Sequence, residues 1–376
     1  MPKHVSASIW LVVASVAVHA QVNKISIAAG TPEDKDLIAI GNQEDAQKKI
    51  AMYQDFLKKY ASNPSAVAYA NWQLSQSYQS LGDLGKALDY GDQAIAGSPN
   101  NLDILMSQVM IAQQLKDNSK TFQYANAGGE AYDSIDKQTK PADLSDEQFA
   151  SAVAADKDTN KNAYQFFQNA AFGAIGAETD AKGRMDKIEK FSATFPKSGM
   201  DDQLTSYALL SLSELKDTPR LIAYGEKAVA ENPNNVPAML MLANTYADSS
   251  DSAALTKATK YAEQAILVSK ADEPDADKSR KIAAGVAHST LGRVYAKQQK
   301  TTPSITELKA ATTLLKGQDE QQYAIAAYFL GWDYAKQKRL AEARAILSDA
   351  ASIPGPMQPS TKDLLAKVNS ARAAAK

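Results

Sequence analysis

Residues 68–101 read AYANWQLSQSYQSLGDLGKALDYGDQAIAGSPNN. The first half carries side chains spaced three or four residues apart, namely Asn71, Leu74, Tyr78 and Leu81. The second half repeats this spacing with Ala87, Tyr90 and Ala94. Such spacing places each set on one face of a helix, and Gly82 and Pro99 are suited to end the two helices. The stretch therefore predicts a pair of facing helices, which cannot bury its apolar face without further units.

The same pattern recurs along the chain. The segment DYGDQAI at 89–95 returns as AYGEKAV at 223–229 and as KYAEQAI at 260–266. The first two copies are each followed, four residues later, by Pro-Asn-Asn. A second segment, LGRVYAKQ at 291–298, returns as LGWDYAKQ at 330–337. Recurrence of one helix pair along a chain indicates an array in which each unit packs on its neighbours.

The order of the key residues in 68–101 resembles the tetratricopeptide repeat (TPR), a helix-turn-helix unit of about 34 residues. These residues are Leu74, Tyr78, Gly82, Ala87, Tyr90, Ala94 and Pro99, with Trp72 one place from its usual position. The resemblance implies an all-α fold, a TPR solenoid of stacked antiparallel helix pairs. It also implies that the first helix of each pair lines a concave groove that holds a peptide or a partner helix.

The repeats define an expected domain organisation. Residues 1–20 are expected to be a signal peptide, 21–42 a lead-in linker, 43–357 the TPR-like array and 358–376 a C-terminal capping helix that starts at a Ser/Thr cap. The best units are 68–101, 202–235, 236–272, 285–318 and 324–357. Residues 102–198 are degenerate, and within them 136–164 is expected to be an irregular bridge with one capped helix from Ser145 to Ala155.

Composition limits the classes of function. The chain has 376 residues, of which 44% are hydrophobic and 22% charged, values that are ordinary for a folded protein. A formal charge of −2 gives no basic field for a phosphate backbone, so no general nucleic-acid binding is expected. A mean hydropathy of −0.36 argues against an integral membrane domain. Because there is no cysteine, disulfides, thiolate metal sites and an N-terminal thioether lipid are excluded.

The first twenty residues have the layout of a signal peptide. Lys3 and His4 precede a mostly apolar run from Val5 to Val18, and Val18-His19-Ala20 suits a signal peptidase. The run is short for a membrane span. We therefore expect cleavage after Ala20 and a periplasmic or secreted protein, with an uncleaved membrane anchor as the alternative.

Motifs for catalysis and for cofactors are not found in the sequence. There is neither G-x-G-x-x-G nor G-x-x-x-x-G-K-[ST], and His288 is the one histidine that follows the leader. His288 precedes Leu291 and Tyr295 by three and seven residues, which predicts a packing role on the buried face of its helix. No catalytic residue and no cofactor is therefore expected.

Two acidic segments contain residues that could bind a metal ion. The stretch DKDTNKN at 156–162 begins like a calcium loop, but Lys161 stands where the loop needs glycine and Phe167 where it needs glutamate. We expect it to be a solvated helix connection. The second segment has carboxylates at Asp272, Glu273, Asp275 and Asp277 and is expected to be a solvated loop. No metal site is therefore expected.

The candidate binding residues lie on the stripe beside the buried one on each first helix. They are Trp72, Gln76, Gln79, Ser206, Leu210, Leu240, Asn244, Ser289, Arg293, Lys297, Tyr328, Trp332 and Lys336. Trp, Tyr and Arg are frequent at binding hot spots. Trp72 and Trp332 could instead fill space between units. TPR proteins that clamp a C-terminal carboxylate need polar residues where Trp72, Ser206 and Leu240 stand, so that activity is not expected.

The sequence thus favours a non-catalytic exported scaffold that binds proteins or peptides. An alternative is an envelope-assembly or secretion accessory protein, because YQDFLKKY at 53–60 and Pro64 are similar to repeats of outer-membrane assembly lipoproteins, although the lipid-bearing cysteine is missing. A third alternative is an exported enzyme with a carboxylate-only site. The fold class alone does not choose between these functions.

Overall fold

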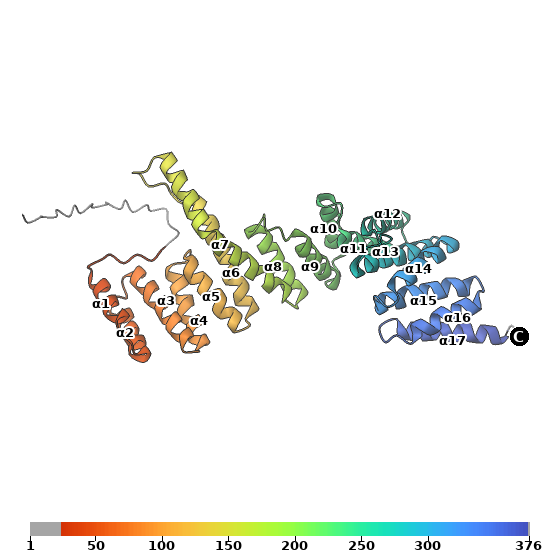
Figure 1. Ribbon diagram of the computed structural model, residues 1–376, viewed down its shortest axis with the longest axis horizontal. Helices are drawn as coiled ribbons and strands as arrows, with labels where there is room; N and C mark the ends of the chain where they lie inside the picture. Colours follow the sequence, from red (N-terminus) through yellow and green to blue (C-terminus); the bar gives the residue numbers. More distant parts are fainter. Residues whose placement is uncertain (1–23, 375–376) are drawn as a thin grey trace, which may run out of the picture. The chain divides into compact units, whose positions relative to one another are not determined.

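The computed structural model describes residues 24–374, which form seventeen α-helices and one 3-10 helix and contain no strand (Figure 1). The helices up to the middle of the chain are α1 (Pro32–Gly41), α2 (Ala46–Lys59), α3 (Pro64–Ser80), α4 (Leu84–Gly97), α5 (Leu102–Gln114), α6 (Asn118–Asp133), the 3-10 helix Ser134–Lys137, α7 (Asp146–Gly176) and α8 (Ala181–Thr194). They are followed by α9 (Asp201–Glu214), α10 (Thr218–Glu231), α11 (Val236–Asp248), α12 (Ser252–Ser269), α13 (Lys278–Lys297), α14 (Thr301–Leu315), α15 (Glu320–Lys336), α16 (Leu340–Ala351) and α17 (Gln358–Ala374).

The helices form two compact units. The first comprises the described residues up to Thr179 together with Asp186–Ser198, and the second comprises Asp180–Met185 and the residues from Gly199 onward. In each unit, consecutive helices pack against each other, as in the pairs α3 and α4, α13 and α14, and α15 and α16. The predicted fold class, an all-α array of antiparallel helix pairs with TPR spacing, is confirmed within each unit.

One turn geometry joins five of these pairs. The turn residue with a left-handed backbone is Gly82 in one pair and Lys116, Lys216, Gln299 or Lys338 in the others, with φ between 56° and 78°. The residue after it donates its backbone N–H to a carbonyl five positions earlier, as Asp83 does to Tyr78 at 3.0 Å and Asp217 to Leu212 at 2.9 Å. This is a Schellman-type helix end, which satisfies carbonyls that the helix itself leaves free. In three of the five turns an aspartate then caps the next helix: Asp83, Asp117 and Asp217.

The packing of the pairs depends on small residues. A Cβ added to Gly331 of α15 would lie 2.5 Å from Leu347 of α16, and a Cβ on Gly292 of α13 would lie 2.6 Å from Leu308 of α14. Both leucines are fully buried. In these two pairs, glycine thus lets the second helix bring a leucine against the backbone of the first.

Contacts of one kind tie successive pairs together. A carboxylate accepts hydrogen bonds from a tyrosine hydroxyl and a lysine ammonium, and that ammonium lies over the tyrosine ring. The four sets are Asp36 with Lys59 and Tyr60, Asp92 with Lys120 and Tyr124, Glu226 with Lys257 and Tyr246, and Asp349 with Lys316 and Tyr323. The Tyr246 hydroxyl and the Lys257 ammonium hold the pKa of Glu226 below its usual range. Each set joins a carboxylate to a lysine and a tyrosine that come from one or two neighbouring helices, through charge-assisted hydrogen bonds.

The structure corrects the expected lead-in linker. Within residues 21–42, the segment Pro32–Gly41 is the helix α1. The Thr31 side chain caps it by accepting from the Asp34 backbone N–H, and Pro32 occupies its first turn, where proline is well suited. Ile40 is buried in a cluster with Tyr53 and Phe56 of α2. Gly30 therefore precedes a helix, Pro32 begins it and Gly41 ends it.

The expected bridge over 136–164 also needs correction. Its helix starts at Ser145 as expected, with a capping box formed by Ser145 and Gln148. It does not end at Ala155 but continues as the 31-residue helix α7, so 156–162 is neither a calcium loop nor a connection between helices. No proline interrupts this stretch, and its second half is anchored by Phe167, whose ring lies against Gly128 of α6.

The C-terminal helix covers the end of the second unit. Val368 of α17 is buried in a cluster with Leu330 and Leu347, and Leu364 and Leu365 pack beside it. A helix is thus present at the expected place, as Gln358–Ala374. The expected Ser/Thr cap was wrong, because Ser360 and Thr361 lie within the helix and the Thr361 hydroxyl donates to the carbonyl of Met357.

Candidate functional site: the stripe of the first helices

One position recurs on the first helix of each pair and carries the candidate site. It lies six residues before the left-handed turn residue, and we call it the stripe position. Its occupants are Gln76 in α3, Met110 in α5, Leu210 in α9, Arg293 in α13 and Trp332 in α15. Helix α11 lacks that turn, but Asn244 lies two residues before Tyr246, as Trp332 does before Tyr334.

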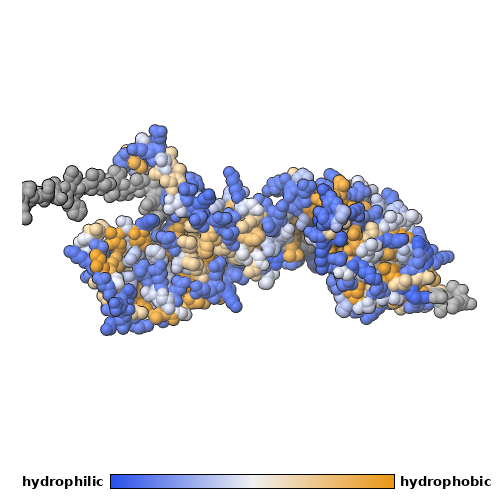
Figure 2. Space-filling model, in the orientation of Figure 1, coloured by the Kyte–Doolittle hydropathy of each residue, from blue (hydrophilic) through white to orange (hydrophobic). Residues whose placement is uncertain are grey.

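The stripe position is exposed where it is apolar. Met110, Leu210 and Trp332 keep 42%, 45% and 40% of their surface accessible and are three of the eight large hydrophobic residues that are exposed in residues 24–374. Three others, Leu81, Leu115 and Leu215, share the position directly before the turn residue. Figure 2 shows that hydrophobic residues are interspersed with hydrophilic ones over the visible face of each unit. A solvent-facing apolar side chain at one repeated position is a feature that packing of the pair does not require.

Met110 was missed in the sequence because its repeat has lost the TPR signature residues. Gln108 and Ala112 stand where the better repeats have Leu74 and Tyr78. The repeat period was nevertheless a usable signal, since Met110 follows Gln76 by one unit length.

Trp332 does not fill space between units. The neighbouring residues Leu330, Asp333 and Tyr334 are buried, whereas Trp332 is exposed and the Lys336 ammonium lies 5.1 Å from its ring centroid. Tyr328, one turn earlier, is half-buried with its ring edge-on to Phe329. The three predicted residues of α15 therefore share one accessible face.

Trp72 is a packing residue in comparison. It is half-buried, its ring lies edge-on to Tyr69 with centroids 6.5 Å apart, and its Nε1 is buried with no hydrogen-bond partner. Gln76 and Gln79 on the same helix are half-buried. Of the two tryptophans, Trp332 therefore offers the larger contact face.

The polar residues predicted on α11 and α13 bind each other. Asn244 Oδ1 accepts from the Thr290 hydroxyl at 2.6 Å and from Arg293 at 3.3 Å, while Arg293 also pairs with Asp248 at 2.9 Å. The Lys297 ammonium donates to the carbonyls of Ala247, Asp248 and Ser249 at 2.6–3.1 Å. Lys297 thus binds the free carbonyls at the C-terminal end of α11, where a positive charge is favourable, and links α11 to α13.

Three further predicted residues are less suited to contact a partner. Ser289 is buried, so its side chain cannot reach one directly. Leu240 packs against the core of α11, α12 and α13. The Ser206 hydroxyl donates to the carbonyl of Asp202 within its own helix at 3.0 Å.

His288 lies mostly buried at the edge of the packed face of its helix, in agreement with the expected packing role. Its side chain is 20% exposed, and its Nδ1 lies 2.6 Å from Glu307 Oε2 of α14. Leu291 and Tyr295 define the packed face, but a histidine three residues earlier lies at its edge, where a charged partner on the neighbouring helix can reach it.

The acidic segment before α13 is partly neutralised by its own basic residues. Glu273 forms ion pairs with Lys270 at 3.4 Å and with Arg280, which also pairs with Asp275. The Arg280 guanidinium holds the pKa of Glu273 below its usual range. Within residues 24–374, no three acidic or histidine side chains are grouped so that they could hold a metal ion. None of the helices in that range is long and apolar enough to cross a membrane.

Comparisons with known proteins found similar structures. No protein-family model matches the sequence, and no curated protein sequence matches it. A TPR protein from Parabacteroides merdae is 11% identical with a TM-score of 0.33, over 89% of this chain and 98% of that chain. The TPR domain of P58(IPK) is 10% identical with a TM-score of 0.33, over 92% of this chain and 99% of that chain. Since both TM-scores are below 0.5, the repeat class of this chain rests on its own helix pairs.

Proposed function

We propose that this protein is a non-catalytic exported scaffold that binds proteins or peptides along the stripe position of its first helices. The observation that carries the proposal is the exposure of Met110, Leu210 and Trp332 at one repeated position. Aromatic and apolar anchors surrounded by polar residues are typical of binding hot spots. Neighbouring first helices are in contact within the second unit, as α11 is with α13 and α13 with α15, so their stripe positions follow one another.

Site-specific photo-crosslinking tests where partners bind. A photoreactive phenylalanine derivative at Leu210 is expected to form adducts with a partner in envelope extract. The matched control is Leu267, which is 76% exposed but lies on the second helix α12. Adducts of equal yield at both positions would mean that exposure alone governs contact and would contradict the stripe assignment.

A substitution then tests the contribution of the aromatic anchor. Trp332→Ala is expected to weaken binding of the crosslinked partner by about 2 kcal/mol or more, which is about 30-fold, because a hot-spot ring is removed. Since the ring is 40% exposed, the free energy of unfolding should change little. A loss of about 3–5 kcal/mol of stability with unchanged affinity would instead assign Trp332 to the core.

Export is proposed from the leader, which lies outside the described residues. The layout of Met1 to Ala20 supports a cleaved signal peptide and a periplasmic or secreted protein. The intact mass of protein recovered from the producing cells should correspond to a chain that begins at Gln21, and Val12→Asp should retain the protein in the cytoplasm. A full-length chain recovered in membranes would favour the uncleaved anchor.

A further inference from the structure

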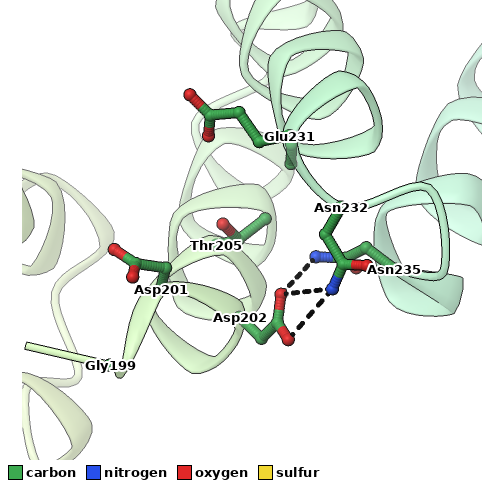
Figure 3. A pocket seen from close by; sticks show the side chains of 8 residues that line it. Gly199, Asp201, Asp202, Thr205, Glu231, Asn232 and Asn235 are labelled. Carbon is green, nitrogen blue, oxygen red and sulfur yellow. Dashed lines mark hydrogen bonds between the residues drawn. The ribbon is translucent and has the colours of Figure 1, made fainter.

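A cavity of about 310 Å³ lies in the second unit, where the start of α9, the end of α10 and the turn to α11 meet (Figure 3). It has the volume of a small-ligand site. It is lined by three carboxylates, those of Asp201, Asp202 and Glu231, and none of the described residues that line it is basic. The carbonyl end of α10 adds a partial negative charge to the same place.

Hydrogen bonds hold Asp202 in position, whereas the charges of Asp201 and Glu231 are at most weakly neutralised. Asp202 Oδ1 accepts from Asn232 and Asn235 at 3.1 Å, and Oδ2 accepts from Asn232 at 3.2 Å, as Figure 3 shows. The ion pair recorded for Glu231 is with Lys227 at 3.7 Å, and both side chains are largely exposed. For Asp201 no ion pair is found among residues 24–374. The cavity therefore keeps an excess of negative charge.

A largely buried threonine whose hydroxyl has no partner within residues 24–374 is an independent sign of a ligand at the cavity. Thr205 lines the cavity and is 9% exposed, and its hydroxyl forms no hydrogen bond among the described residues. Hydroxyls at Ser206, Ser211 and Thr245 on the same or the neighbouring first helix donate to a carbonyl four residues earlier. Figure 3 shows Thr205 among the acidic side chains, where a bound group would meet its unused hydroxyl.

The acidic cavity is not a general feature of the repeats. Aligning the two Pro-Asn-Asn copies, at Pro99 and Pro233, places Val67, Ala68 and Gly97 where the second copy has Asp201, Asp202 and Glu231. In the first copy a Cβ on Gly97 would meet the Cβ of Ala68 at 3.0 Å, so helices α3 and α4 pack closely there. The acidic cavity is thus specific to the copy at 202–235.

We propose that this cavity binds a primary alkylammonium group. An ammonium offers three donors to carboxylate and hydroxyl oxygens, which are what Asp201, Glu231 and Thr205 provide. The volume exceeds that of a bare ion and accommodates the alkyl chain that carries the charge. A lysine side chain of a bound protein and a free diamine share this chemistry.

Binding to the purified chain tests the proposal with three probes at 0.15 M salt. The probes are 1,5-diaminopentane, the peptide acetyl-Gly-Lys-Gly-amide and its norleucine analogue, followed by calorimetry and by amide chemical shifts of 199–235. The lysine peptide is expected to bind and the norleucine peptide not to bind. Binding of the diamine as well would identify a site for free amines, whereas binding of the peptide alone would identify a site for a protein side chain. If neither cationic probe shifts these amides, the proposal is overturned.

Variants distinguish binding in the cavity from non-specific attraction of a cation to an acidic protein. The double variant Asp201→Asn with Glu231→Gln is expected to weaken binding at least 10-fold, and Thr205→Val, which keeps the shape of the side chain, by about threefold or more. The control is Asp272→Asn with Glu263→Gln, which removes the same charge from exposed positions of the second unit. Equal weakening in the control, or no change in the cavity variants, would overturn the proposal. Melting curves by circular dichroism confirm that each variant is folded.

Discussion

At the residue scale, Asp333 is the least expected side chain of the second unit. It is buried beside α14, where the Ser304 hydroxyl donates to its Oδ2 at 2.5 Å, and its Oδ1 has no partner. Burial raises the pKa of the Asp333 carboxyl, and the Ser304 bond offsets this in part. The pKa of Asp333 is higher in the folded than in the unfolded chain, so the folded state binds the proton more tightly. The contribution of Asp333 to the free energy of unfolding therefore falls as the pH rises from the unfolded pKa to the folded pKa.

We expect Asp333→Asn to stabilise the protein at neutral pH. The amide removes the buried charge but can still bond Ser304, so the free energy of unfolding should rise by about 1–2 kcal/mol at pH 7. Near pH 3 the carboxyl is protonated in both states, and the gain should vanish. Urea unfolding at the two pH values measures this, with Asp89→Asn on an exposed face of α4 as the control. A gain that is equal at both pH values would contradict this account of Asp333.

Left-handed lysines offer a second test at this scale. Lys216 has a φ of 56° in an exposed turn, a conformation that costs a residue with a Cβ about 1 kcal/mol. Lys216→Gly should therefore raise the free energy of unfolding by about 0.5–1 kcal/mol, as read from the urea midpoint. At the equivalent Gly82, whose φ is 78°, Gly82→Ala should lower it by a similar amount. Changes of the same sign at both sites would refute the backbone explanation.

At the scale of elements, close approach between the two helices of a pair is the feature most open to test. A methyl group on Gly331 would meet the Leu347 side chain at 2.5 Å, so Gly331→Ala should lower stability by about 1–3 kcal/mol. Gly173 of α7 has no such neighbour within 4 Å, and Gly173→Ala should raise stability by about 0.5–1 kcal/mol through helix propensity. Thermal melts of the two variants should therefore shift in opposite directions.

The sequence predicts those elements whose ends are marked and whose faces repeat. Gly82 and Pro99 delimit α3 and α4 correctly, because a left-handed turn and a helix stop have few other solutions. The helix α1 was not predicted, because Gly and Pro occur in loops as well as at helix ends and only the burial of Ile40 decides between them. The end of α7 was placed too early, because the polar residues 156–162 continue the helix and one of them, Lys157, contacts Tyr132 of α6 and Asp136, which the sequence does not reveal.

The sequence predicts which residues share the stripe of the candidate site, but not which of them are accessible to a partner. Periodicity alone places Leu210, Arg293 and Trp332 on one stripe. It does not reveal that Asn244, Arg293 and Lys297 bond across helices, because those partners come from residues more than forty positions apart in the chain. Nor does it reveal the cavity at Asp201, which depends on where three helix ends meet.

At the scale of the whole molecule, the second unit should fold without the first. The fragment 180–376 contains the whole second unit together with Asp186–Ser198 of the first. It keeps Arg184 with its contacts to Ser211 and Glu214, and it includes the capping helix α17. Repeat arrays draw their stability from contacts between neighbouring units, so this fragment should be helical and melt cooperatively. Circular dichroism measures both. A fragment that is helical but melts without a cooperative transition would contradict the division of the chain into these two units.

The distance between successive stripe positions also determines which residues of an extended ligand can contact them. Packed helices lie about 8–10 Å apart, and an extended chain advances about 3.3 Å per residue. A strand-like segment lying across α9, α11, α13 and α15 would thus meet Leu210, Asn244, Arg293 and Trp332 with roughly every third of its residues. The order of these four side chains would favour a ligand with a hydrophobic group at each end and hydrogen-bonding or acidic groups between, so that reversing its sequence would change its fit.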